Sequence, residues 1–108
     1  MEDLVVRWAN TFNSGHPKQV VSLYCTDGVL VPTLEPAILL SRREIFTYLH
    51  DLIVNKGAKV QVNAYTKVSG VESGFYTFTL GDGSELVARF TFVPRRGKIV
   101  THHSSEVP

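Results

Sequence analysis

The hydrophobic period of the chain changes once, near Gly57, and this change restricts the folds that the sequence can adopt. Before Gly57, apolar residues recur at the three- and four-residue spacing of amphipathic helices. After it, β-branched and aromatic residues fill four segments that read as strands. This order predicts an α+β fold with three N-terminal helices on one face of a curved, mainly antiparallel sheet. We expect residues 1–108 to form a single domain.

The helix boundaries follow from local signals. The first helix is expected over about residues 4–12, with a stop at the Asn-Ser-Gly of residues 13–15. The second is short, has Pro17 in its first turn and carries Tyr24 on its apolar face. The third opens at the capping-box pattern Ser-Arg-Arg-Glu of residues 41–44 and ends near Gly57.

Turn residues separate the expected strands. Asp27-Gly28 is predicted as a turn, and residues 29–31 as a short strand that Pro32 stops. Asp82-Gly83 indicates a tight hairpin, and the basic cluster at residues 95–98 indicates a solvated turn. The remaining strands are expected over residues 60–68, 74–80, 85–93 and 99–104.

Composition limits the binding partners and the cellular compartment that we expect for the protein. The formal net charge is +1, which gives no electrostatic basis for binding nucleic acid or an anionic membrane. No apolar run approaches the length of a membrane span, and the acidic start Glu2-Asp3 is unlike a signal peptide. The single cysteine, Cys25, excludes an internal disulfide and is expected as a buried structural thiol at a helix end. A cytoplasmic location is expected.

Polar groups concentrate at the end of the last strand, in Thr-His-His-Ser-Ser at residues 101–105. Side chains alternate between the two faces of a strand, so His102 and Ser104 share one face while His103 and Ser105 share the other. One of these sets can line an interior pocket as a unit.

Arg89 occupies the middle of an expected strand, and two orientations are open to it. If Arg89 faces a cavity, then Phe90 and Phe92 face outward and indicate a dimer interface. In the opposite arrangement the phenylalanines belong to the core and the arginine reaches solvent.

Several stretches together are similar to the iota-class carbonic anhydrases. That family is built on the association-type domain of calcium/calmodulin-dependent kinase II, a branch of the cone-shaped nuclear transport factor 2-like fold. The most specific stretches are the Pro-Thr-Leu at residues 32–34 and the His-His-Ser-Ser at residues 102–105. The others are Trp8-Ala9, residues 13–17, Tyr24, residues 29–31, Tyr48-Leu49, residues 76–80, Asp82-Gly83 and residues 88–93.

The resemblance implies reversible hydration of carbon dioxide to bicarbonate. It places the catalytic groups at Thr33, Tyr48, His102 and Ser104, and we take Arg89, His103 and Ser105 as candidates for substrate binding. Some members of the family are described as metal-free, although others are reported to use manganese. The chain departs from the family pattern at Thr101, where a third histidine is common, at Pro94, which replaces an aromatic residue, and at Glu35-Pro36.

The residues themselves favour a metal-free site, with no cofactor. His102 and His103 are adjacent on a strand and therefore face opposite ways, and no carboxylate accompanies them. Hydroxyls could instead position one water and the oxygens of bicarbonate, with His102 orienting them or accepting a proton near neutral pH. An apolar slot for carbon dioxide is expected from residues such as Phe75, Phe78 and Leu52.

Two other functions remain open at this point. The chain could be an association module, which assembles as a homodimer or larger oligomer and holds a small carboxylate beside Arg89. It could also be an isomerase or dehydratase of the ketosteroid or polyketide type, which needs a carboxylate as general base. Asp51 and Glu35 are the candidates for that base, and Asp51 lies on the same expected helix as Tyr48 but not at the i+4 spacing.

Overall fold

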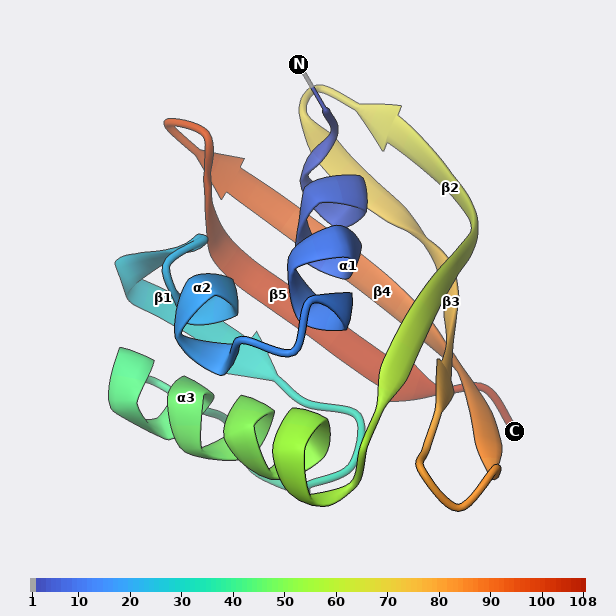
Figure 1. Ribbon diagram of the computed structural model, residues 1–108. Coiled ribbons are helices and arrows are strands. Elements are labelled where there is room, and N and C mark those ends of the chain that lie inside the picture. The colour runs from blue at the N-terminus through green and yellow to red at the C-terminus, as the bar shows by residue number, and fades with distance from the viewer. Residues whose placement is uncertain (1) are drawn as a thin grey trace.

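The computed structural model describes residues 2–108 as helices packed on one face of a five-stranded sheet (Figure 1). The helices are α1 (Leu4–Asn13), α2 (Pro17–Val21) and α3 (Arg42–His50), and α3 continues into the π-helical turn η1 (Asp51–Asn55). The strands are β1 (Tyr24–Val31), β2 (Lys59–Val68), β3 (Val71–Thr79), β4 (Glu85–Arg95) and β5 (Lys98–Glu106). The α+β prediction is confirmed. None of the helices in this part of the chain is both long and apolar enough to cross a membrane.

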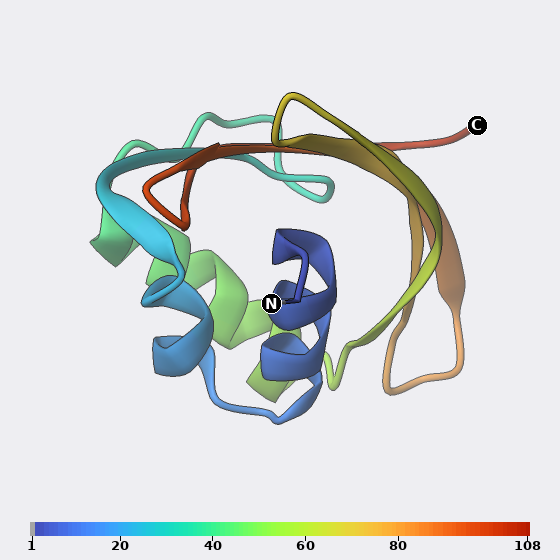
Figure 2. The ribbon, with the colours of Figure 1, turned by 90° about the horizontal axis from the view of Figure 1, so that it is seen from above.

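The sheet has the order β1-β5-β4-β3-β2 and curls around the helices (Figure 2). Neighbouring strands run antiparallel except β1, which pairs with β5 in parallel. The first and last strands of the chain therefore lie side by side. This pairing brings the loop after β1 next to the polar end of β5.

The first strand is longer than predicted. Tyr24 does not lie on a helix face but begins β1, and Asp27-Gly28 lies inside that strand instead of forming a turn. The pairing of β1 with β5 shifts register between Tyr24 and Val29, so the glycine signal marks a bulge. A Cβ on Gly28 would lie 3.1 Å from the carbonyl oxygen of Ile99, so the two strands approach closely there. Cys25 lies in this strand and is half-buried, contrary to the expectation of a buried thiol at a helix end.

The predicted caps and turns are otherwise confirmed. Ser41 accepts a hydrogen bond from the backbone N–H of Glu44 at 3.1 Å, and so caps α3. Arg96 and Gly97 have φ values of 54° and 79°, the left-handed conformation of a two-residue turn between β4 and β5. The basic cluster at residues 95–98 is thus a hairpin turn, as expected.

A buried carboxylate joins α1 to the sheet. Glu72 on β3 is only 1% exposed and accepts hydrogen bonds from the backbone N–H groups of Leu4 and Val5, at 2.8 and 2.7 Å. These two groups have no partner within the helix, because the first turn of any α-helix leaves its N–H groups free. Glu72 therefore fixes the N-terminus of α1 to the sheet, and its negative charge complements the helix dipole.

Substitution of Glu72 with glutamine is expected to lower the free energy of unfolding by about 1–3 kcal/mol, because the amide nitrogen cannot accept a hydrogen bond and leaves one buried N–H group unpaired. Urea denaturation measures the change. The exposed Glu106, substituted in the same way, is the matched control. Equal stabilities of the two variants would contradict this role for Glu72.

Candidate functional site

A small cavity of about 10 Å³ lies between the sheet and the helices. This volume corresponds to about one water molecule. The cavity is lined by Trp8, Leu30, Pro32, Thr33, Tyr48, Leu49, Leu52, Tyr76, Phe78, His102 and Ser104. All four candidate catalytic residues are in this set, although they come from separate segments of the chain.

The pairing of β1 with β5 explains how the hydroxyls meet. Thr33 follows the end of β1, and Ser104 lies on the inward face of β5, where it is 3% exposed. Their side-chain hydroxyls form a hydrogen bond, across 71 positions of sequence. Thr33 is therefore not an ordinary loop residue, because its hydroxyl is held at the cavity wall by Ser104.

His102 is enclosed by aromatic rings. The residue is 2% exposed, and its ring stacks on Phe92 at a centroid distance of 4.1 Å. Its Nδ1 atom hydrogen bonds to the hydroxyl of Tyr24 at 2.7 Å, and its Nε2 atom to that of Tyr76 at 3.0 Å. Burial, with a smaller contribution from His103, lowers the pKa of His102 to about 3. The imidazole is therefore neutral and can orient hydroxyls, but it does not accept a proton near neutral pH, the other role considered for it.

Tyr48 projects from α3 to the rim of the cavity and is 9% exposed. Burial raises the pKa of Tyr48 to about 12, against the opposing effect of the backbone N–H groups of Leu34 and Thr33. Tyr48 also lines a surface depression of about 260 Å³ next to Glu35 and Arg43. The tyrosine ring thus separates the cavity from the surface.

The sequence did not single out Tyr24 and Tyr76 as polar members of the site. Tyr76 is one of the buried positions on the inner face of β3, as is Phe78, and this pattern indicates a core aromatic residue, so only its hydroxyl distinguishes Tyr76 from Phe78. Burial raises the pKa of Tyr76, and the hydroxyls of Ser104 and Thr33 oppose this effect. Tyr76 therefore hydrogen bonds to Nε2 of His102 and lines the same cavity as Thr33 and Ser104.

The three candidate substrate-binding residues lie on the other face of the sheet. Arg89 and Ser105 are paired across β4 and β5, and His103 is exposed two positions along. Phe90 and Phe92 are buried, so the arrangement with an outward arginine is the one observed. Because the sheet separates them from the cavity, these three residues cannot bind the same small ligand as Thr33 and Ser104.

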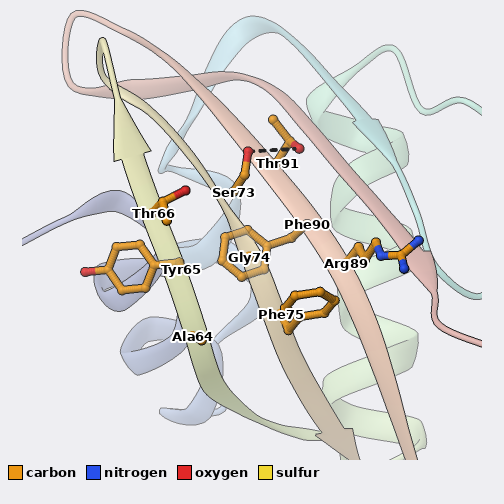
Figure 3. Close-up of a pocket in the computed structure, with 9 residues that line it drawn as sticks. All are labelled: Ala64, Tyr65, Thr66, Ser73, Gly74, Phe75, Arg89, Phe90 and Thr91. Carbon is orange, nitrogen blue, oxygen red and sulfur yellow. Dashed lines mark hydrogen bonds between the residues drawn. The ribbon is translucent and has the colours of Figure 1, made fainter.

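The outer face carries a groove of its own, with a volume of about 430 Å³ (Figure 3). Its residues come from β2, β3 and β4, and the guanidinium carbon of Arg89 lies 5.8 Å from the ring centre of Phe75. Phe75 is 40% exposed here and does not contribute to an interior slot as expected, whereas Phe78 and Leu52 do line the cavity.

The cavity residues do not fit a divalent cation such as manganese. Both ring nitrogens of His102 are held by tyrosine hydroxyls, and no carboxylate lines the cavity. Within residues 2–108, no group of three His, Cys, Asp or Glu side chains gathers with metal-binding geometry. Asp51, a candidate general base, instead forms an ion pair with Lys56 at 3.0 Å. Neither Asp51 nor Glu35 lines the cavity.

Comparison with known proteins places the chain among small α+β domains. No family model matches the chain, and no curated protein matches it. A candidate polyketide cyclase of Sinorhizobium meliloti has a TM-score of 0.84 at 12% identity, with 96% of this chain and 94% of that chain covered. A candidate ketosteroid isomerase of Kribbella flavida has a TM-score of 0.82 at 13% identity, with 97% and 76% covered. At such identities the likeness shows the fold alone.

One solved structure is much more similar in sequence. It is a candidate calcium/calmodulin-dependent protein kinase II association domain of Xanthomonas campestris, with 37% identity and a TM-score of 0.82. The match covers 97% of this chain and 84% of that chain. On this identity over nearly its whole length, the chain belongs to the calcium/calmodulin-dependent protein kinase II association-domain family, within the nuclear transport factor 2-like fold.

Proposed function

We propose that this protein is a metal-free carbonic anhydrase, which hydrates carbon dioxide to bicarbonate reversibly in the interior cavity. The observation that supports the proposal is the convergence of Thr33, Tyr48, His102 and Ser104 on one cavity. These four residue types, in this order along the chain, are the ones that the resemblance to the iota class implies. The proposal includes a cytoplasmic location and the action of residues 1–108 as one domain.

The chemistry needs a positioned water and donors for the charge that develops. The water oxygen forms a bond to the carbon of carbon dioxide, one carbon–oxygen π bond opens, and a proton leaves to solvent or buffer. In this proposal the hydroxyls of Thr33 and Ser104, which hydrogen bond to each other, hold the water and the carbon dioxide oxygens. His102 and Tyr48 have pKa values of about 3 and about 12, so neither is a general base matched to pH 7. Modest turnover is therefore expected.

Admission of the substrate requires the cavity to enlarge, because it holds only about one water. Tyr48 is the side chain that borders both the cavity and the surface depression. We infer that displacement of this ring opens the route for carbon dioxide, and that its hydroxyl then contacts bicarbonate.

Stopped-flow measurement with a pH indicator, on chelator-treated protein, tests the activity. The Ser104→Ala variant is expected to lose at least about tenfold in kcat/KM, because it removes one donor to the developing charge. Ser105→Ala is the matched control, since Ser105 lies on the same strand but on the outer face. Absence of any rate above buffer for the folded wild-type protein would eliminate the carbonic anhydrase proposal.

A second candidate function is self-association, with or without a bound carboxylate. The outer face exposes Phe75 and Val87 at 40% and 41%, beside Arg89, and the Xanthomonas relative is a candidate association domain. Sedimentation velocity is expected to show a dimer or larger assembly. The Val87→Glu variant should dissociate it, and a monomeric wild-type protein at all concentrations would refute this second function.

A further inference from the structure

A continuous chain of hydrogen bonds runs from Trp8 to the cavity. The indole Nε1 of Trp8 donates to the hydroxyl oxygen of Tyr24 at 3.1 Å. That hydroxyl contacts Nδ1 of His102 at 2.7 Å, and Nε2 of His102 contacts the hydroxyl of Tyr76 at 3.0 Å. Both tyrosines are fully buried, so each proton in the chain must find its partner within the protein or in the cavity.

The first member of this chain fixes the direction of every bond after it. An indole N–H can only donate, so the Tyr24 oxygen accepts from Trp8. The single proton of Tyr24 is then used toward Nδ1 of His102, which must be the unprotonated ring nitrogen. Nε2 therefore carries the imidazole proton and donates it to the Tyr76 oxygen. The proton of Tyr76 remains free to point into the cavity, which Tyr76 lines together with Thr33 and Ser104.

The opposite direction of the hydrogen bond between Tyr24 and His102 would leave the buried hydroxyl proton of Tyr24 without a partner. If Nδ1 of His102 carried the proton, the Tyr24 oxygen would accept two hydrogen bonds and its own proton would have no acceptor. Within residues 2–108, the Tyr24 hydroxyl makes no hydrogen bonds beyond these two. Tyr76 lines the cavity and Tyr24 does not, so only the Tyr76 proton has another place to donate, and the tautomer ratio is expected to favour Nε2–H by about tenfold or more.

We propose that Trp8, Tyr24 and His102 form a relay of hydrogen bonds that fixes the direction in which Tyr76 donates. The hydroxyl of Tyr76 then donates into the cavity, and the cavity selects a small oxyanion as its ligand. The relay members are positioning residues, because they act through Tyr76: both ring nitrogens of His102 are engaged by tyrosine hydroxyls, so His102 lines the cavity without a free polar atom for the ligand. A donor at the end of the relay favours carboxylate or carbonate oxygens and disfavours cations and ligands that only donate. The identification of that oxyanion with bicarbonate rests on the proposed function.

The tautomer is tested directly by ¹⁵N nuclear magnetic resonance of His102 at pH 7. The bare and protonated ring nitrogens have well separated chemical shifts, and the wild-type protein is expected to show a bare Nδ1 and a protonated Nε2. In the Tyr24→Phe variant Nδ1 loses its donor, and the fraction of the Nδ1–H tautomer should rise. A wild-type protein with Nδ1–H would overturn the relay, whatever its activity.

Titration with bicarbonate and with acetate tests the donor. Tyr76→Phe is expected to weaken binding of either anion by about tenfold or more, and Tyr24→Phe by a smaller factor. Tyr65→Phe is the matched control, because its hydroxyl bonds to Asp3, away from the cavity. Unchanged affinity in Tyr76→Phe, or a wild-type protein that binds neither anion, would overturn the inference. Tyr76-dependent acetate binding without hydration of carbon dioxide would leave it standing and refute only the proposed reaction.

Discussion

Replacement of Gly74 with alanine is expected to lower the free energy of unfolding by at least about 3 kcal/mol. A Cβ at this position would lie 2.0 Å from the carbonyl oxygen of Ala64 and 2.6 Å from the Cα of Tyr65. Both obstacles are backbone, so no rotation of a side chain can relieve the clash. The pairing of β2 with β3 shifts register nearby, between Val62 and Ala64, in a sheet that bends around the helices (Figure 2).

The bend matters for the site because Gly74 is two residues from Tyr76 on the same strand. A shift of β3 that makes room for a methyl group also moves the Tyr76 hydroxyl away from His102. Gly83→Ala is the control: Gly83 has a φ of +88° but no atom within 4 Å of the added Cβ. Its cost is expected to be about 1–2 kcal/mol from backbone strain alone. Thermal unfolding curves compare the two, and a Gly74→Ala variant as stable as Gly83→Ala would contradict the close approach.

The element types were predictable because each depends on local spacing. The apolar stripe of α1, the serine cap of α3 and the turns at Gly15, Gly83 and Gly97 depend on a few neighbouring residues, and the structure confirms them. The first strand was misread for the opposite reason. Asp27-Gly28 has the chemistry of a turn, and only the pairing of β1 with β5, over 70 positions away, converts it into a bulge.

In the candidate site, too, local patterns were predictable and contacts between distant segments were not. Alternation along the last strand established that His102 and Ser104 share a face, and the structure places that face at the cavity. Alternation could not show which face of the sheet the helices cover, so Arg89, His103 and Ser105 were grouped with a cavity that they do not reach. Tyr24 and Tyr76 were missed because a buried tyrosine and a buried phenylalanine follow the same hydrophobic pattern. Only the hydrogen bonds of their hydroxyls to His102 show that these tyrosines belong to the site.

Acidification is expected to destabilise the protein through His102 before most carboxylates are protonated. Burial lowers the pKa of this imidazole from 6.5 to about 3 in the folded protein, whereas the unfolded chain takes up the proton near pH 6.5. The unfolded state therefore binds more protons between these values, and stability falls as pH falls through this window. The loss is complete only below about pH 3. Between pH 6.5 and 4.5 it amounts to about 2 kcal/mol, at about 1.4 kcal/mol per pH unit.

Urea denaturation at several pH values measures this loss, and His102→Gln should flatten the pH dependence because glutamine does not titrate. His103→Gln is the matched control, since His103 is the exposed neighbour on the same strand. The ring signals of His102 in the folded wild-type protein provide a second measurement, and they should not titrate between pH 8 and 4.5. Titration of His102 near pH 6.5 would contradict its burial between Phe92 and the two tyrosines. Protonation would also place a second N–H against the Tyr24 proton, so ligand binding at the cavity should fail together with stability.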